Sequence, residues 1–317
     1  MPDEGSIGEL LQQAGRLLNL RQFEDASQML DRVLAGGREC LSPSERRHAF
    51  QCAFKCASRR GEWVRGEALA RQAIAEGHDT AQKLAILASL AFGTKVAQSA
   101  VYVEGISSIA PEDLSWADEL GYRVKLLGVA VDTGKGIEQR VHPTMVRKDS
   151  AIAQVMGVTN AVTVDADAVA AITLVGPGAG GMATASAVVA DIGDIARGVR
   201  TPPFGRATDR LVTSRKAPMQ RHEGGYYIRL LARDKPGTAA TIARRLAQQG
   251  ISLESIVQRH SGPRPQGGDR PDKTAGPVPV ILITYATTED AVRRALAAVK
   301  RDRVISGAPQ VIRIEKN

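Results

Sequence analysis

The sequence predicts an α+β protein in which a helical segment, a mixed segment and a β-α-β-β-α-β segment follow one another. Up to residue 76, apolar residues recur at the three- and four-residue spacing of amphipathic helices. Residues 77–198 mix such helices with short runs typical of strands. Residues 199–224 contain several prolines and few periodic apolar positions, which predicts a linker. We therefore expect a helical module at 1–76, a mixed α/β domain at 77–198, the linker, and a second small domain at 225–317.

Within the helical module, a pattern recurs about forty residues along the chain. The stretch "RQFEDASQMLDRVLAGG" aligns with "GEWVRGEALARQAIAEG", so that Phe23 falls opposite Trp63 and Gly37 opposite Gly77. The placement of aromatic and small residues resembles tetratricopeptide-type helical hairpins. An ordinary bundle of helical hairpins explains the pattern equally well, because two repeats bury little surface on their own.

In the mixed segment, glycine and proline mark where the elements begin and end. Two stretches read as helices, 79–93 and 112–121, and the last residue of each is a glycine. Four stretches read as strands, namely 123–133, 136–146, 160–166 and 171–177. The last strand leads into "GPGAGG", a glycine turn that opens a helix reaching residue 198.

Composition excludes several classes of protein. No run of eighteen apolar residues predicts a membrane helix, and the acidic N-terminus lacks the layout of a signal peptide. The net charge of +8 is spread over a chain with only 4% aromatic residues, which argues against a nucleic-acid partner. Three early cysteines suit a reducing cytoplasm, and we expect a cytoplasmic protein.

No metal site is expected. His48, Cys52 and Cys56 share one predicted helix face, but small buried cysteines explain that spacing better than a metal site that lacks a fourth ligand. His142, directly before a proline at a strand end, is expected to be structural.

Asp79 and Lys83 stand one helical turn apart at the start of the helix at 79–93. Residues four apart share a helix face, so the spacing by itself predicts an exposed ion pair worth a few tenths of a kcal/mol.

The surrounding motifs resemble the substrate domain of homoserine dehydrogenase. "GHDTAQKLAILASLAFG", "VYVEGISSI", "WADELGYRVKLLG", "VHPTMVRKDSAIAQVMGVTNAV" and "GPGAGG…TASAVVADIGDIARG" occur in that family's order. The first contains the end of the family signature, Gly77, Asp79 and Lys83. The resemblance implies that Lys83 is the catalytic proton-transfer residue and that Asp79 binds substrate. It also implies interconversion of L-homoserine and L-aspartate 4-semialdehyde with NADP or NAD, in threonine and methionine biosynthesis, by a homodimer.

The chain departs from that family before residue 77. The family begins with a Rossmann domain, whereas residues 1–76 show no strand with a glycine loop. We therefore expect negligible activity from the chain alone. A G-x-G-x-x-G pattern does occur after the last strand, but no second β-strand follows, which makes it a weak dinucleotide fingerprint. By the same resemblance it is a secondary cofactor contact, made by Gly178, Gly180 and Thr184.

The last segment resembles an ACT domain, a ferredoxin-like module that senses small molecules in amino-acid metabolism. The stretch "RDKPGTAATIARRLAQQGISLESI" carries this resemblance, with Asp234, Pro236 and Gly237 in the turn before a helix. Glycine there lets backbone N–H groups approach a carboxylate, so these residues are candidate effector ligands, with threonine the effector that the resemblance implies. The loop at 261–277, rich in proline, glycine and charge, is expected to be mobile. A non-catalytic regulatory or scaffold protein with an ACT sensor is the alternative function.

Overall fold

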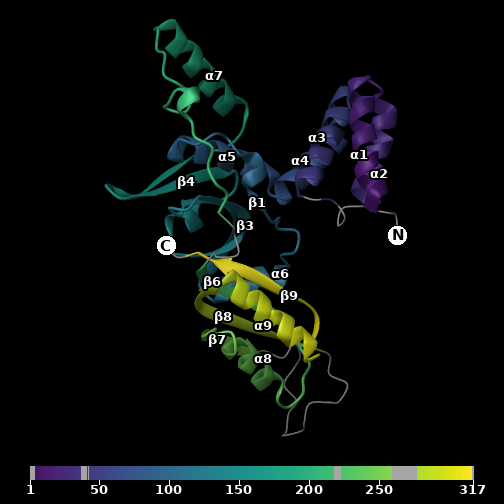
Figure 1. Cartoon of the computed structure of the whole chain (residues 1–317), viewed down its shortest axis with the longest axis vertical. Coiled ribbons are helices and arrows are strands. Elements are labelled where there is room, and N and C mark those ends of the chain that lie inside the picture. Colours follow the sequence, from purple (N-terminus) through teal and green to yellow (C-terminus); the bar gives the residue numbers. More distant parts are fainter. Residues whose placement is uncertain (1–3, 37–40, 42, 218–222, 259–276, 316–317) are drawn as a thin grey trace. The chain divides into compact units, whose positions relative to one another are not determined.

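The structure is a computed structural model of the chain, and it describes residues 4–36, 41, 43–217, 223–258 and 277–315 (Figure 1). The loop predicted at 261–277 falls outside the described residues except for Pro277. The chain forms two compact units. Unit 1 comprises residues 1–107, 126–142 and 210–217, and unit 2 comprises residues 108–125, 143–209 and 218–317.

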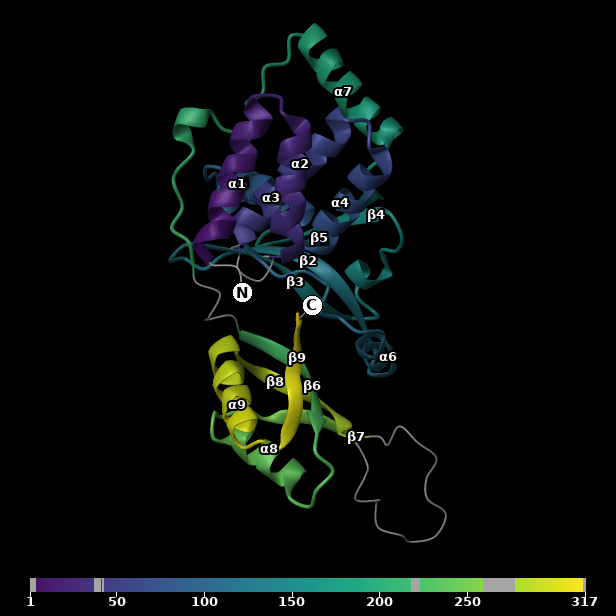
Figure 2. The same cartoon turned by 90° about the vertical axis from the view of Figure 1, so that its right-hand side faces the viewer.

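Unit 1 begins with four helices that pack in chain order, each against the next (Figure 2). They are α1 (Glu4–Asn19), α2 (Phe23–Gly36), α3 (Pro43–Arg59) and α4 (Trp63–Ala75). Their shared core holds fully buried side chains such as Leu30, Ala53 and Cys56. Arg65 of α4 reaches back to α2, where it binds Asp31 at 2.6 Å. The helical character of the predicted module is present, and its likeness to tetratricopeptide hairpins stays a prediction.

The rest of unit 1 is a helix packed against strands. Helix α5 (His78–Phe92) is followed by the 3₁₀ turn η1 (Gln98–Ala100) and strand β1 (Tyr102–Val103). β1 pairs in parallel with β3 (Ile137–Arg147), which also pairs with β2 (Tyr122–Asp132). Apolar side chains of α5, among them Leu84, pack against Val141 of β3 and against Val101, which follows η1. β2 and β3 contribute residues to both units.

Part of the predicted linker is tied into unit 1 by its backbone. The Lys95 N–H donates to the carbonyl of Val212, and the Ile137 N–H donates to the carbonyl of Arg215, both at 2.9 Å. Leu211 is buried. Residues 210–217 are therefore held along the sheet rather than left as an unpaired connection.

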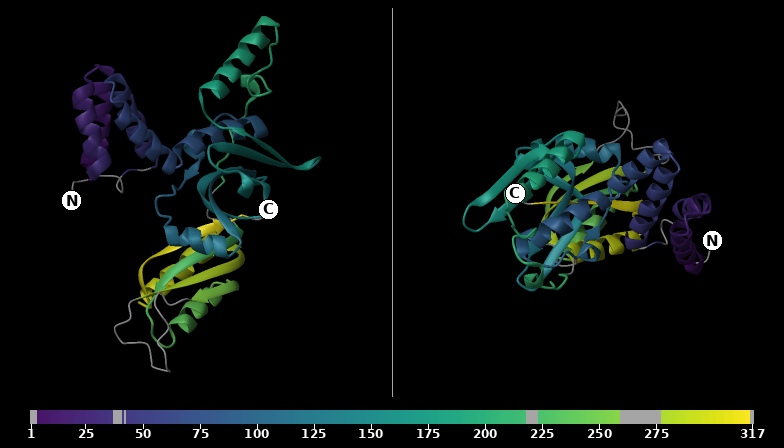
Figure 3. Two further views of the ribbon diagram at one scale, coloured as in Figure 1. Left: turned by 180° about the vertical axis from the view of Figure 1, so that it is seen from behind. Right: turned by 90° about the horizontal axis from the view of Figure 1, so that it is seen from above.

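Unit 2 contains a strand–helix segment with few buried side chains. Strand β4 (Thr159–Ala166) pairs antiparallel with β5 (Ala170–Pro177), and α7 (Gly181–Ala196) follows (Figure 3). α7 is rich in apolar residues, yet none of its side chains is buried. Two 3₁₀ turns, η2 (Ala151–Gln154) and η3 (Thr208–Arg210), flank this segment.

The predicted β-α-β-β-α-β order is confirmed in the C-terminal part of unit 2. The elements are β6 (Glu223–Ala232), α8 (Thr238–Ala247), β7 (Leu253–Gln258), β8 (Val278–Thr288), α9 (Glu289–Arg301) and β9 (Ile305–Ile314). β6 lies between β8 and β9 and pairs antiparallel with both, and β7 extends the sheet beyond β8.

The two faces of this sheet bury different partners. Tyr226, Ile228 and Leu230 face the core that α8 and α9 cover. Tyr227 points to the other face, where it packs in a cluster with Ala117 of helix α6 (Pro111–Glu119). Figure 2 shows α6 on the side of the sheet away from α9. The strand alternation of β6 therefore places successive side chains in two separate cores.

Candidate functional site

Gly77 sets the position of the N-terminus of α5. It has φ +81° and precedes the helix as its N-cap residue. A Cβ atom at Gly77 would lie 3.0 Å from Cγ1 of Val141 and 3.3 Å from Cγ1 of Val103. Both the left-handed backbone and the lack of space favour glycine, so the first turn of α5 is pressed against β1 and β3.

Asp79 and Lys83 form the ion pair that their spacing predicts. The Lys83 Nζ lies 2.8 Å from the Asp79 carboxylate, and the two side chains are 48% and 49% exposed. No other side chain in the described part of the chain makes a hydrogen bond or ion pair with either residue. The geometry by itself is thus a half-exposed i,i+4 pair, and a substrate-facing role for it stays a prediction.

The same face of α5 continues as a row of exposed apolar side chains. Ile86 and Leu90 are each 52% exposed, and Leu87 is 39% exposed. Their spacing of three and four residues beyond Lys83 places them on the face that carries the ion pair. The Asp79–Lys83 ion pair and an exposed apolar surface therefore lie next to each other on α5.

His78, which sequence reasoning passed over, lies on the buried side of α5. Its side chain is 6% exposed, with Nε2 3.5 Å from the carboxylate of Glu76. The imidazole ring lies 6.2 Å from the Phe50 ring of α3, tilted by 51°. The residue directly before Asp79 thus connects the helix of the ion pair to the helical module.

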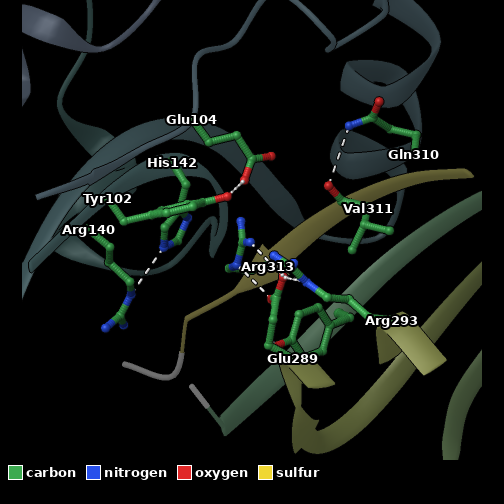
Figure 4. Close-up of polar contacts among 10 residues, drawn as sticks. Tyr102, Glu104, Arg140, His142, Glu289, Arg293, Gln310, Val311 and Arg313 are labelled. Atoms are coloured by element: carbon green, nitrogen blue, oxygen red, sulfur yellow. Dashed lines mark hydrogen bonds and ion pairs between the residues drawn. The ribbon is translucent and has the colours of Figure 1, made fainter. Parts of the chain in front are cut away.

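A second polar cluster lines one face of β3 (Figure 4). Arg140 donates from Nε to Nε2 of His142 at 3.1 Å and from Nη1 to Glu138, and all three residues are buried. On the neighbouring strand, the Tyr102 hydroxyl donates to Glu104 at 3.1 Å. His142 is fully buried and hydrogen-bonded to Arg140, as expected of a structural histidine.

The glycine turn before α7 has the backbone that its sequence predicts. Gly180, with φ +120°, precedes the helix, and the Thr184 N–H donates to its carbonyl at 3.1 Å. At Gly178, an added Cβ would overlap the side chain of Asn160 at 2.0 Å. Helix N–H groups beside glycines suit a phosphate group. The preceding strands are antiparallel, however, and in the described part of the chain no β-α-β unit completes a dinucleotide site.

The other predicted turn, between β6 and α8, holds Asp234, Pro236 and Gly237. Gly237 has φ +86° and is the N-cap residue of α8. The Thr238 N–H donates to the Lys235 carbonyl at 3.2 Å, which closes the turn. The turn thus meets the backbone requirement of the predicted effector site, while ligand binding there stays a prediction.

Two buried carboxylates in unit 2 are held by arginines. Asp113 binds Arg229 at 2.6 and 2.9 Å and also accepts from the Tyr227 hydroxyl at 2.9 Å. Burial opposes ionisation of Asp113, but these hydrogen bonds outweigh it and lower the pKa of the carboxyl. Glu289 likewise binds Arg313 at 2.9 and 3.0 Å, and the positive charge of Arg313 lowers the pKa of Glu289 against the effect of burial (Figure 4).

The cysteines behave as core residues. Cys52 and Cys56 are buried in the helical module, and burial raises the pKa of both thiols. Within the described residues, no three histidine, cysteine or acidic side chains gather in a metal-binding arrangement. Among the same residues, no helix has the length and apolarity needed to span a bilayer.

Comparison with known proteins relates both parts of the chain to one enzyme. The family model "Homoserine dehydrogenase" matches residues 68–192, and the model "ACT domain" matches residues 226–301. The homoserine dehydrogenase of Neisseria gonorrhoeae is 41% identical over 246 residues, which cover 76% of this chain and 54% of the relative. That of Pseudomonas aeruginosa is 41% identical over 247 residues, covering 76% of this chain and 55% of the relative. The chain therefore spans about half the length of these curated relatives.

A solved structure gives the same result. The crystal structure of a homoserine dehydrogenase from Thiobacillus denitrificans matches with a TM-score of 0.68 at 38% identity. The match covers 86% of this chain and 61% of that one. A homoserine dehydrogenase from S. aureus shares the fold, with a TM-score of 0.56 at 22% identity, covering 85% of this chain and 60% of that one.

Proposed function

The chain carries a homoserine dehydrogenase domain followed by a C-terminal ACT domain, and we propose that it contributes the substrate-binding part of a homoserine dehydrogenase. The reaction is the NAD(P)-dependent interconversion of L-homoserine and L-aspartate 4-semialdehyde. The observation that carries this proposal is the pair of Asp79 and Lys83 at the start of α5, which follows a glycine whose φ and close neighbours disfavour a side chain.

Lys83 is the proton-transfer residue in this proposal. When homoserine is oxidised, Lys83 would act as the neutral amine and take the proton of the substrate hydroxyl, and NAD(P) held by a nucleotide-binding domain would supply the hydride acceptor. In the reverse reaction, the Lys83 ammonium would return that proton to the oxygen. Asp79 binds the polar groups of the substrate and keeps the ammonium of Lys83 in place at 2.8 Å. A cation beside the reacting oxygen also stabilises the alkoxide charge that develops there.

The cofactor contact proposed for this chain is the turn of Gly178, Gly180 and Thr184. Its support is the helix N-terminus and the open space beside Gly180, which lets phosphate oxygens approach the backbone. Hydride transfer also needs the nicotinamide fixed near the substrate carbon. The described residues before His78 are helical, so we expect the nicotinamide to be held by a nucleotide-binding domain that lies outside the described residues.

The proposed assembly is a homodimer with an amino-acid effector. Support for the dimer comes from apolar side chains of β5 and α7 that are more than half exposed, including Leu174, Val189 and Ile195. Large exposed apolar patches are typical of interaction surfaces. Support for the effector, for which threonine is our candidate, comes from the Asp234–Gly237 turn at the N-terminus of α8.

Calorimetric titration with L-homoserine tests the substrate site without requiring turnover. We expect binding that weakens in Asp79→Asn, whereas the matched exposed variant Asp194→Asn, in the ion pair with Arg197, leaves it unchanged. In a parallel assay with homoserine and NADP, the chain alone should reduce negligible cofactor. Absence of homoserine binding up to about 10 mM, well beyond the affinity of a useful site, would favour the regulatory or scaffold alternative.

A further inference from the structure

A small cavity in unit 2 lies apart from every residue discussed as a site so far. Its volume is about 190 Å³, and nine residues line it: Tyr122, Arg147, Gly225, Glu254, Thr284, Tyr285, Ala286, Ile314 and Glu315. Gly225 lies at the start of β6, whereas the Asp234 turn follows the end of that strand. At about 3.3 Å per residue, the two places are roughly 30 Å apart along the chain.

The cavity has a closed floor. Thr284 and Ile314 are buried, at 1% and 9% exposed. A Cβ at Gly225 would lie 3.3 Å from both the Ile314 Cβ and the Thr284 carbonyl oxygen. Gly225 therefore packs closely on the residues of the floor. The size of the cavity suits a small metabolite rather than the ligands that fill sites of roughly 300–1,000 Å³.

Charges of both signs act on Tyr122. Burial and then the negative charge of Glu254 raise the pKa of Tyr122, while the charge of Arg147 lowers it. Both charged groups thus lie close enough to act on one phenol. Glu254 makes no hydrogen bond or ion pair with the described part of the chain, and its side chain is exposed. Arg147 binds Asp149 through Nε at 3.0 Å and Nη2 at 2.6 Å, which leaves Nη1 outside that pair.

These charges discriminate among classes of ligand. A phosphate would meet Glu254 and Glu315 with one arginine to balance them. An apolar ligand would bury the Glu254 carboxylate without a partner, which is costly. A ligand with one ammonium and one carboxylate satisfies Glu254 and Arg147 together, and two tyrosine rings can flank its carbon atoms.

We propose that this cavity binds a free α-amino acid with a small uncharged side chain, its ammonium on Glu254 and its carboxylate on Arg147. The ligand would join two parts of the sequence. Tyr122 and Arg147 belong to the homoserine dehydrogenase match at 68–192, whereas Glu254 and Tyr285 belong to the ACT match at 226–301. Binding would therefore stabilise the contact between the two sequence domains within unit 2.

Hydrogen exchange of the whole chain, read by mass spectrometry, tests the proposal at the level of peptides. The probes are L-alanine, L-threonine and L-methionine, each up to about 10 mM. We expect at least one to slow exchange in peptides covering 252–256 and 284–286, around two of the lining strands. Glu254→Gln and Arg147→Gln should each weaken that protection by about tenfold or more, because each removes one charge-assisted partner. Both side chains are exposed, so neither change threatens folding.

Matched controls separate this site from its neighbours. Arg123 follows Tyr122 in β2, so its side chain points to the opposite face of the strand. Arg123→Gln should therefore leave the protection unchanged. Threonine methyl ester and 3-hydroxybutyrate lack the carboxylate and the ammonium respectively, and both should fail to protect. The proposal is overturned if no amino acid protects these peptides, if 3-hydroxybutyrate protects as well as threonine, or if protection appears at 233–238 and is lost in Asp234→Asn instead.

Discussion

Replacing Asp113 by asparagine removes a buried charge and keeps the size of the side chain. Asp113 is fully buried and accepts four hydrogen bonds, two of them from Arg229 at 2.6 and 2.9 Å. The other two come from the Tyr227 hydroxyl at 2.9 Å and the Ala110 N–H at 3.0 Å. Asparagine has one acceptor oxygen and an NH₂ group, so at least one donor would face another donor.

The expected cost is about 3 kcal/mol in the free energy of unfolding of unit 2. Removing one partner of a buried ion pair typically costs about 3 to 5 kcal/mol. The lower end applies because the Arg229 side chain is 19% exposed and can recover some hydration. This is about a hundredfold change in the unfolding equilibrium.

Urea unfolding followed by tryptophan fluorescence measures this cost locally. The chain has two tryptophans, and Trp116 packs near Ala117 in the core that contains Tyr227. A Trp63→Phe background therefore reports on α6 alone. With an m-value of about 1 to 3 kcal/mol/M, the midpoint should fall by roughly 1 to 3 M.

Asp149→Asn is the matched control for Asp113→Asn. Asp149 also binds an arginine through two hydrogen bonds, but its side chain is 62% exposed. We expect no measurable shift of the urea midpoint, since exposed pairs contribute little. Equal losses in the two variants would show that burial of the Asp113 pair does not determine its contribution.

Three further predictions concern acid stability, the α5 turn and assembly. The pKa values of Asp113 and Glu289 are lower in the folded chain than in the unfolded chain, where they are about 3.9 and 4.3. Their contribution to stability is therefore present above the unfolded values and is lost as the pH falls through the folded values. Circular dichroism melts should show unit 2 losing stability below about pH 4, and a flat profile from pH 5 to 3 would contradict this. Gly77→Ala should destabilise unit 1 by about 1 to 3 kcal/mol, because alanine would have a strained φ of +81° and a Cβ only 3.0 Å from Val141. Gly121→Ala is the control: its φ is +84° but no atom lies within 4 Å of the added Cβ, so it measures the backbone part of the cost alone. Val189→Asp on α7, 65% exposed, should convert the proposed homodimer to monomer in light scattering without lowering the melting temperature of unit 2, and a wild-type monomer at tens of micromolar would refute the dimer.

Local elements were predictable from the sequence, whereas the pairing of distant charges was not. The strand expected at 136–146 is observed at Ile137–Arg147, because the flanking residues and the apolar pattern act within a few positions. Asp113, by contrast, reads in the sequence only as an acid in the first turn of a helix. Its bond to Arg229 spans 116 residues and depends on α6 lying against β6, which no local pattern encodes.

The candidate site shows the same division. The spacing of Asp79 and Lys83 correctly predicted their contact, since four residues make one turn of a helix. His78 was missed because its partner, Phe50, lies in another helix, so neither periodicity nor spacing marks it. The cavity beside Tyr122 was also missed, because its lining comes from six strands or their ends, spread over nearly 200 residues.

The exposure of α5 bears on how Lys83 can work. In water, the attraction between its ammonium and a developing alkoxide is weak, and it grows about fourfold when the effective dielectric constant falls from about 80 to about 20. Lys83 is half exposed here, and Ile86, Leu87 and Leu90 beside it are uncovered. A domain that packs on this apolar row would exclude water from the ion pair as it delivers the nicotinamide. The domain that brings the nicotinamide would therefore also strengthen the electrostatic stabilisation by Lys83. For this reason we expect loss of that domain to reduce activity more than it reduces homoserine binding.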